Sequence, residues 1–148
     1  MKKLSLFLLG FVATSFMASA QVTSDMFVAP ANTGANMTVG VNASKFDQFE
    51  GGQIGAFYDL DGDGTAECVG LESIQVGFFG LALWGDDSST PEADGLASGA
   101  VPQFALLHDG NVIMVAEIPQ FTGYVTNGIV NITDAGLSGG SGCTDVGA

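Results

Sequence analysis

Apolar residues recur at every second position along much of the chain beyond residue 35, which is the period of a β-strand. The stretch NMTVGV at 36–41 alternates in this way, and further short apolar runs follow, each bounded by glycine-bearing turns. Such runs are typical of short strands rather than helices. They predict strands at 36–41, 54–58, 68–71, 76–84, 104–108, 112–118, 123–125 and 129–132.

The turns between these runs support antiparallel pairing. Asp109-Gly110 and Asn127-Gly128 are dipeptides that favour two-residue hairpins. No long amphipathic helix is predicted; a single helical turn is expected at 90–95, with Thr90 as its cap. The pattern predicts an all-β protein, an antiparallel β-sandwich of jelly-roll or immunoglobulin-like type. The side chains expected between its sheets are Ile54, Phe57, Val69, Leu83, Phe104, Leu106, Val112 and Met114.

The N-terminus has the pattern of a signal peptide. Lys2 and Lys3 precede an apolar region at 4–17, and Ala18-Ser19-Ala20 matches a cleavage site. The predicted organisation is a signal peptide at 1–20, a β-sandwich domain at 21–135 and a Gly/Ser-rich flexible tail at 136–148. We expect an extracellular, cell-surface or periplasmic protein with no transmembrane segment in the mature chain.

Charge narrows the range of partners. The chain has 3 basic and 16 acidic residues, and removal of Lys2 and Lys3 leaves Lys45 alone, for a net charge of −15. Such a surface repels polyanions, so nucleic acid is not an expected partner. It attracts cations, although most of these carboxylates are expected to be simply solvated.

The stretch DLDGDG at 59–64 is the clearest candidate for a metal site. Asp59, Asp61 and Asp63 take alternate positions and Gly64 allows a sharp turn, as in calcium-binding loops. An EF-hand needs a glutamate at position 12, which is Gly70 here, whereas Glu67 takes position nine. Two interpretations remain open: a Ca²⁺ site formed by Asp59, Asp61, Asp63 and Glu67, or an acidic hairpin tip without metal.

A second acidic loop follows the run at 76–84 and contains Asp86, Asp87 and Asp94. Its carboxylates can cap backbone N–H groups or coordinate a cation, and capping is the commoner role.

Three aromatic residues, Tyr58, Trp84 and Tyr124, are candidates for stacking on a sugar, although a core position is the commoner one for Trp84. His108 is the only histidine and no nucleophile motif accompanies it, so no enzymatic activity is predicted. Cys68 and Cys143 are able to form a disulfide in an exported chain, but spacing alone leaves their pairing open.

Three stretches of this sequence resemble a β-sandwich module of secreted, multidomain surface proteins of marine Bacteroidetes. They are QIGAFY at 53–58, ECVG at 67–70 and ALWGDDSSTPEADG at 82–95. The tail GCTD at 142–145 resembles the start of the cysteine repeats that often follow such modules, whereas Gly99-Ala100 departs from the usual Gly-Glu pair. The resemblance carries no enzymatic activity.

The expected function is that of an exported, non-catalytic structural or adhesive module, with Ca²⁺ as its candidate cofactor. Its expected partners are surface proteins or a polysaccharide. The alternatives are a carbohydrate-binding module and, with less support, a secreted hydrolase, because 16 acidic residues allow many carboxylate pairs.

Overall fold

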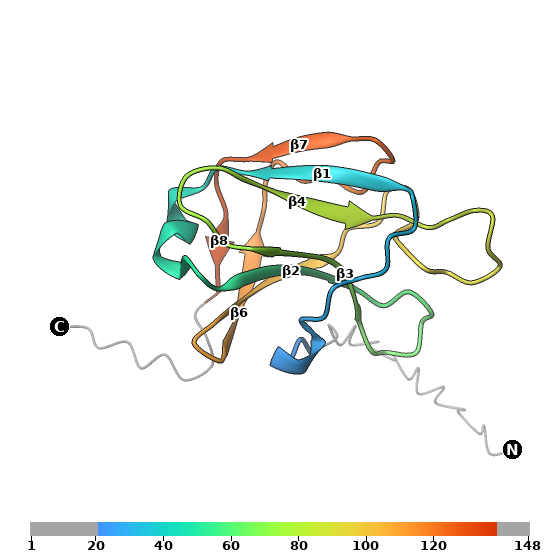
Figure 1. Cartoon of the computed structure of the whole chain (residues 1–148), viewed down its shortest axis with the longest axis horizontal. Coiled ribbons are helices and arrows are strands. Elements are labelled where there is room, and N and C mark those ends of the chain that lie inside the picture. The colour runs from blue at the N-terminus through green and yellow to red at the C-terminus, as the bar shows by residue number, and fades with distance from the viewer. Residues whose placement is uncertain (1–20, 139–148) are drawn as a thin grey trace, which may run out of the picture.

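Two β-sheets pack against each other in the computed structural model, which describes residues 21–138 (Figure 1). This architecture confirms the predicted all-β sandwich. The elements, with η for a 3₁₀ helix, are η1 (Ser24–Met26), β1 (Asn36–Val41), η2 (Ser44–Phe49), β2 (Gln53–Tyr58), β3 (Glu67–Ser73), β4 (Phe79–Trp84), β5 (Gln103–His108), β6 (Asn111–Glu117), β7 (Ile129–Ile132) and β8 (Gly136–Leu137).

The smaller sheet has the order β4-β1-β7. β1 runs antiparallel to β4, with Val39 opposite Leu81, and parallel to β7, with Val39 opposite Val130. The parallel pair is a feature that the sequence did not predict. A parallel neighbour needs a long connection, and β7 lies most of the described chain away from β1.

The larger sheet has the order β3-β2-β5-β6-β8. Its β5–β6 turn is the predicted hairpin: His108 pairs with Asn111, and Asp109 and Gly110 have φ values of 50° and 76°. Positive φ at both central residues is the signature of a type I′ turn, which explains the Asp-Gly pair.

The main core lies between the sheets and follows the alternation of the sequence. Val39, Leu81 and Leu83 point inward from the smaller sheet, and Ile54 and Leu106 meet them from the larger one, all with 0% relative exposure. Burying each such side chain stabilises the fold by about 1.5–3 kcal/mol. The inward face of both sheets is therefore fixed by strand periodicity.

Three of the expected core residues lie elsewhere. Phe57, Val112 and Met114 face away from the second sheet and form a smaller cluster with Val22 and Phe27 of the N-terminal segment. The correction follows from strand periodicity: Phe57 is an odd number of residues from Ile54, and so points to the opposite face. In β6 the residues opposite Leu106 and Phe104 are Ile113 and Val115, which pack on the main core.

Several predicted boundaries also need correction. The expected strand at 123–125 is not formed, because the backbone of Tyr124 bonds to Gly99 and Ala100 instead. The expected helical turn at 90–95 is a series of bends. β8 pairs with β6, so the sheet extends past the expected domain end at residue 135. The predicted signal peptide at 1–20 and the tail from residue 139 lie outside the described residues.

Lys45 links η2 to the segment that follows β7. Its ammonium lies 2.6 Å from a carboxylate oxygen of Asp134 and donates to the carbonyl of Ala135 at 2.9 Å. The hydrogen bond and charge of Lys45 lower the pKa of Asp134. Both side chains are more than half exposed, so the pair contributes little to stability.

Within residues 21–138, no helix is long and apolar enough to cross a membrane.

The packing of Phe104 gives a test of the core. Its side chain is 4% exposed and its ring meets that of Phe121 edge-on, with centroids 5.4 Å apart. We expect Phe104→Ala to lower the free energy of unfolding by about 3–5 kcal/mol in urea denaturation, because it leaves a cavity. Val28→Ala, at a side chain that is 62% exposed, should change it by less than about 0.5 kcal/mol. A similar small loss for Phe104→Ala would contradict the core assignment.

Candidate metal site

The β2–β3 loop is organised around the carboxylate of Asp59. One oxygen accepts hydrogen bonds from the amides of Gly62 (2.7 Å) and Asp63 (3.1 Å), and the other accepts one from Gly64 (2.9 Å). Gly62 and Gly64 have φ values of 76° and 91°, which glycine adopts without strain. The alternating Asp-Gly sequence thus wraps the backbone around one acidic group.

Glu67 closes the loop from the other side. It is the first residue of β3, pairs with Tyr58 of β2, and accepts a hydrogen bond from the amide of Leu60 at 2.8 Å. The hairpin ladder therefore places the glutamate at the base of the loop, opposite the aspartates.

Three of the four predicted metal ligands come together. Asp59, Asp61 and Glu67 each offer a carboxylate oxygen within 4.8 Å of the other two. Asp63 is not part of this group, and one of its oxygens accepts a hydrogen bond from the amide of Thr65 at 2.7 Å. The grouping arises because a hairpin returns residue 67 to residue 59, whereas Asp63 lies at the far end of the turn.

The chemistry of this cluster suits a hard cation. Carboxylate oxygens are the preferred ligands of Ca²⁺ and Mg²⁺, and Ca²⁺ completes its shell with backbone carbonyls and water at about 2.3–2.6 Å. Asp61 is exposed, and Asp59 and Glu67 are partly exposed, so a cation has access from solvent. The prediction that the carboxylates of this stretch form a cluster able to hold a metal ion is confirmed, and the identity of that ion stays a prediction.

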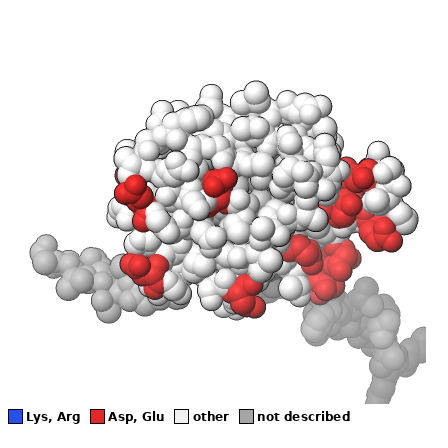
Figure 2. Space-filling model, viewed as in Figure 1, with Lys and Arg blue, Asp and Glu red and all other residues white. Residues whose placement is uncertain are grey.

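Both acidic loops lie at the same end of the molecule, as the grouped red side chains on the right of Figure 2 show. Carboxylates concentrated at one end strengthen the negative potential there and raise the local concentration of cations.

The second loop uses its carboxylates internally. Asp86 accepts a hydrogen bond from the amide of Asp94 (3.1 Å), and Asp94 accepts bonds from the amide of Asp87 (2.9 Å) and the hydroxyl of Thr90 (3.2 Å). Hydrogen bonds from the side chain and amide of Ser89 lower the pKa of Asp87. These bonds are the capping role that the sequence favours for this loop.

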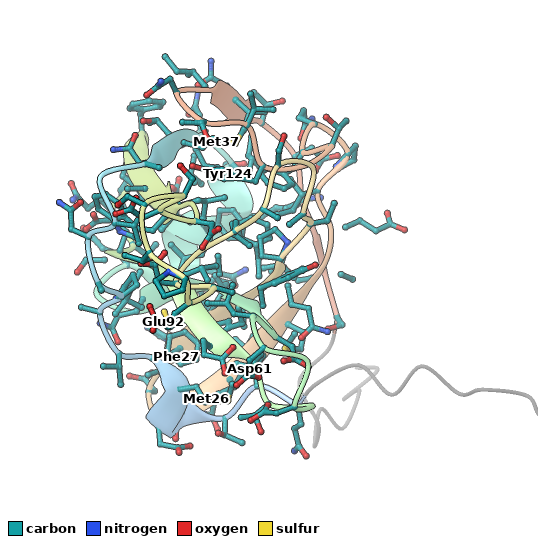
Figure 3. All side chains as sticks on the ribbon, turned by 90° about the vertical axis from the view of Figure 1, so that its right-hand side faces the viewer. Met26, Phe27, Met37, Asp61, Glu92 and Tyr124 are labelled. Carbon is teal, nitrogen blue, oxygen red and sulfur yellow. The ribbon has the colours of Figure 1, made fainter. Side chains whose placement is uncertain are left out.

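Close backbone approach explains the glycines of the same loop. A Cβ at Gly85 would collide with the hydroxyl of Tyr124, and a Cβ at Gly95 would collide with the backbone of Gly85. Tyr124 is 1% exposed and lies inside the molecule beside Met37, in the upper part of Figure 3 and above Asp61. The WGDD stretch is therefore shaped by packing around one buried ring.

The three predicted stacking residues have different environments. Tyr124 is buried, so it is not available to a ligand; this is a correction. Tyr58 packs against the main core, and Trp84 packs against neither apolar cluster. Trp84 has the opposite strand parity to buried Leu83, so it lies on the outer face of its sheet, not at the expected core position.

Phe78 is an exposed aromatic that the sequence analysis missed. Its side chain is 63% exposed, and its ring lies over Gly40 on the outer face of the smaller sheet. The sequence did contain a signal for this position. Phe78 and Trp84 are an even number of residues apart in the apolar run at 76–84, and such a spacing places two strand residues on the same face of a sheet.

Cys68 is partly buried, and its thiol donates to the carbonyl of Gly70 at 3.2 Å. Burial raises the pKa of this thiol, which makes it less reactive. Cys143 lies outside the described residues, so a disulfide between the two stays a prediction.

His108 is the last residue of β5 and directly precedes the Asp109-Gly110 turn. Its described contacts are the carboxylate of Asp109 at 3.4 Å and the ring of Phe49, which meets it edge-on. A half-open cavity of about 450 Å³ lies beside the start of β5 and the end of β6, and apart from Gln103 its lining is apolar, with Val101, Phe104 and Phe121 among the residues. The described lining of this cavity contains no titratable side chain.

The contact between Gly85 and Tyr124 gives a test of the loop. We expect Gly85→Ala to lower the free energy of unfolding by about 1–3 kcal/mol, because the methyl group overpacks the site. Tyr124→Ala removes the hydroxyl and the two ring carbons that the methyl meets, so the double variant should lose less than the sum of the two single variants in a double-mutant cycle. Additive losses would show that the two residues do not meet.

Comparisons of this chain with protein-family models, curated proteins and solved structures find no match. The resemblance of the stretches at 53–58, 67–70 and 82–95 to a surface-protein module therefore stays a prediction.

Proposed function

We propose that the protein is an exported, non-catalytic structural or adhesive β-sandwich module that Ca²⁺ stabilises at the β2–β3 loop. The observation that carries the proposal is the convergence of Asp59, Asp61 and Glu67, whose carboxylate oxygens lie within 4.8 Å of one another. Three carboxylates at this distance repel one another unless a cation or solvent neutralises them.

The donor set favours calcium among biological metals. It consists of oxygen atoms, whereas zinc prefers histidine and cysteine. The loop between β2 and β3 is largely exposed and consists of bends, which suits the variable coordination of Ca²⁺ better than the strict octahedron of Mg²⁺. Asp59 already accepts three amide hydrogen bonds, so it holds the loop in the same arrangement that a cation would need.

A structural or adhesive role fits the remaining features. The signal-peptide pattern supports export, and the acidic loops lie at one end of a sandwich whose strands carry the core. Extracellular fluids supply calcium at concentrations that weak, exposed sites use. A cation at the loop would also relieve repulsion from the neighbouring acidic loop.

Thermal unfolding with and without calcium tests this proposal. At a calcium concentration about 100 times the dissociation constant, binding should add about 2.7 kcal/mol to stability and raise the melting temperature by several degrees. Asp61→Asn should abolish most of this shift, because it removes a charged ligand while its amide oxygen still accepts the amide of Asp63.

Asp63→Asn is the matched control. Asp63 is also an exposed aspartate whose oxygen accepts a backbone amide, but it lies outside the cluster, so its variant should keep most of the calcium shift. Glu67→Gln should lose the shift as Asp61→Asn does. Identical melting curves in calcium and in chelator at one ionic strength would mean that the loop is an acidic hairpin tip without metal.

A further inference from the structure

The outer face of the β4-β1-β7 sheet is an uncharged surface on a strongly acidic protein. None of the three strands contains a charged residue, and the area over them at the top of Figure 2 carries no red side chain. Its outward residues, by strand parity, are Asn36, Thr38, Gly40, Gly80, Ala82, Trp84, Ile129 and Asn131.

Aromatic and amide groups are paired at both ends of this face. At one end Asn36 lies directly opposite Trp84. At the other end Phe78 and Asn131 lie together over Gly40, where a Cβ would collide with both side chains. Between the two ends the side chains project little from the sheet, because Gly80 has no side chain and Thr38 and Ala82 are small.

Exposure of apolar side chains on this face is unusual. Ile129 is 77% exposed and Phe78 is 63% exposed, although Ile129 is the first residue of β7 and Phe78 directly precedes β4. Exposed aromatic and aliphatic groups that cluster with hydrogen-bonding side chains mark interaction surfaces.

We infer that this face binds a neutral, extended oligosaccharide through Phe78, Trp84, Asn36 and Asn131. This inference rests on the adhesive role proposed above and names the class of partner. Sugar rings present apolar C–H faces to aromatic rings, and their hydroxyl groups pair with amides, which both donate and accept hydrogen bonds.

Charge and area argue for this occupant. A polyanion is repelled by the net charge of −15 after removal of the predicted signal peptide, and a cationic partner would be drawn to the acidic loops instead. The three strands, of six, six and four residues, cover about 250 Å². A stable protein interface needs about 800 Å² per partner, so a second copy or a folded protein is too large an occupant for this face alone.

Tryptophan fluorescence tests the inference directly, because Trp84 is the only tryptophan in the chain. We would titrate the protein with cellohexaose, mannohexaose and laminarihexaose as neutral probes, and with an alginate hexasaccharide as the anionic one. At least one neutral probe should change the emission saturably, and the anionic probe should not.

Variants on and off the face separate binding from folding. Phe78→Ala and Asn131→Ala should each weaken binding of the responsive probe by about tenfold with unchanged melting temperature, since both side chains are exposed. Val28→Ala is the control, because Val28 is equally exposed but lies on the N-terminal segment beyond the other sheet. It should bind as the unmodified protein does.

Several results would overturn the inference. The first is no change in emission with any neutral probe at 10 mM, and the second is a loss of binding in Val28→Ala as large as that in Phe78→Ala. The third is the formation of concentration-dependent dimers in ultracentrifugation that Phe78→Ala disrupts; this result would assign the face to a second copy of the chain. Stabilisation by calcium without a sugar response would reject this inference alone. A sugar response without stabilisation by calcium would reject only the metal proposal.

Discussion

Burial of alternating apolar side chains between two sheets is the interaction on which this protein depends. After the predicted signal peptide the chain has a single basic residue, Lys45, so ion pairs contribute almost nothing to its stability. The 16 acidic residues repel one another, and folding brings several of them to one end. The contacts of residues such as Val39, Leu83, Ile54 and Leu106 must outweigh that repulsion. None of the carboxylates among the described residues is buried, so all of them stay in contact with solvent.

Strand positions were predictable because periodicity is local, whereas strand partners were not. The Asp109-Gly110 turn and the strand at 36–41 follow from neighbouring residues alone. The packing of the N-terminal segment on Phe57 and the parallel pairing of β1 with β7 depend on distant parts of the chain. The carboxylate cluster at Asp59 was predictable only in part for the same reason. The sequence identified its carboxylates, but only the hairpin ladder through Tyr58 and Glu67 determines which of them meet.

The two acidic loops show that similar sequences can use carboxylates differently. In the β4–β5 connection, Asp86 and Asp94 satisfy backbone amides across the loop, so their negative charge is used to shape the chain. In the β2–β3 loop, Asp59 shapes the turn, while Asp61 and Glu67 each place one carboxylate oxygen within 4.8 Å of it. The first arrangement is complete without a ligand, and the second leaves a concentration of charge that a cation would relieve.

The parallel pairing of β1 with β7 has a consequence for folding during synthesis of the chain. β1 lies near the start of the described chain and β7 near its end, so the smaller sheet cannot be completed until nearly all of the domain has emerged. Contacts this distant in sequence slow folding, and an unpaired edge of β1 is meanwhile open to strands of other chains. A protein with this topology gains from the strong negative charge that keeps partly folded copies apart, which gives the acidic composition a role before the native structure exists.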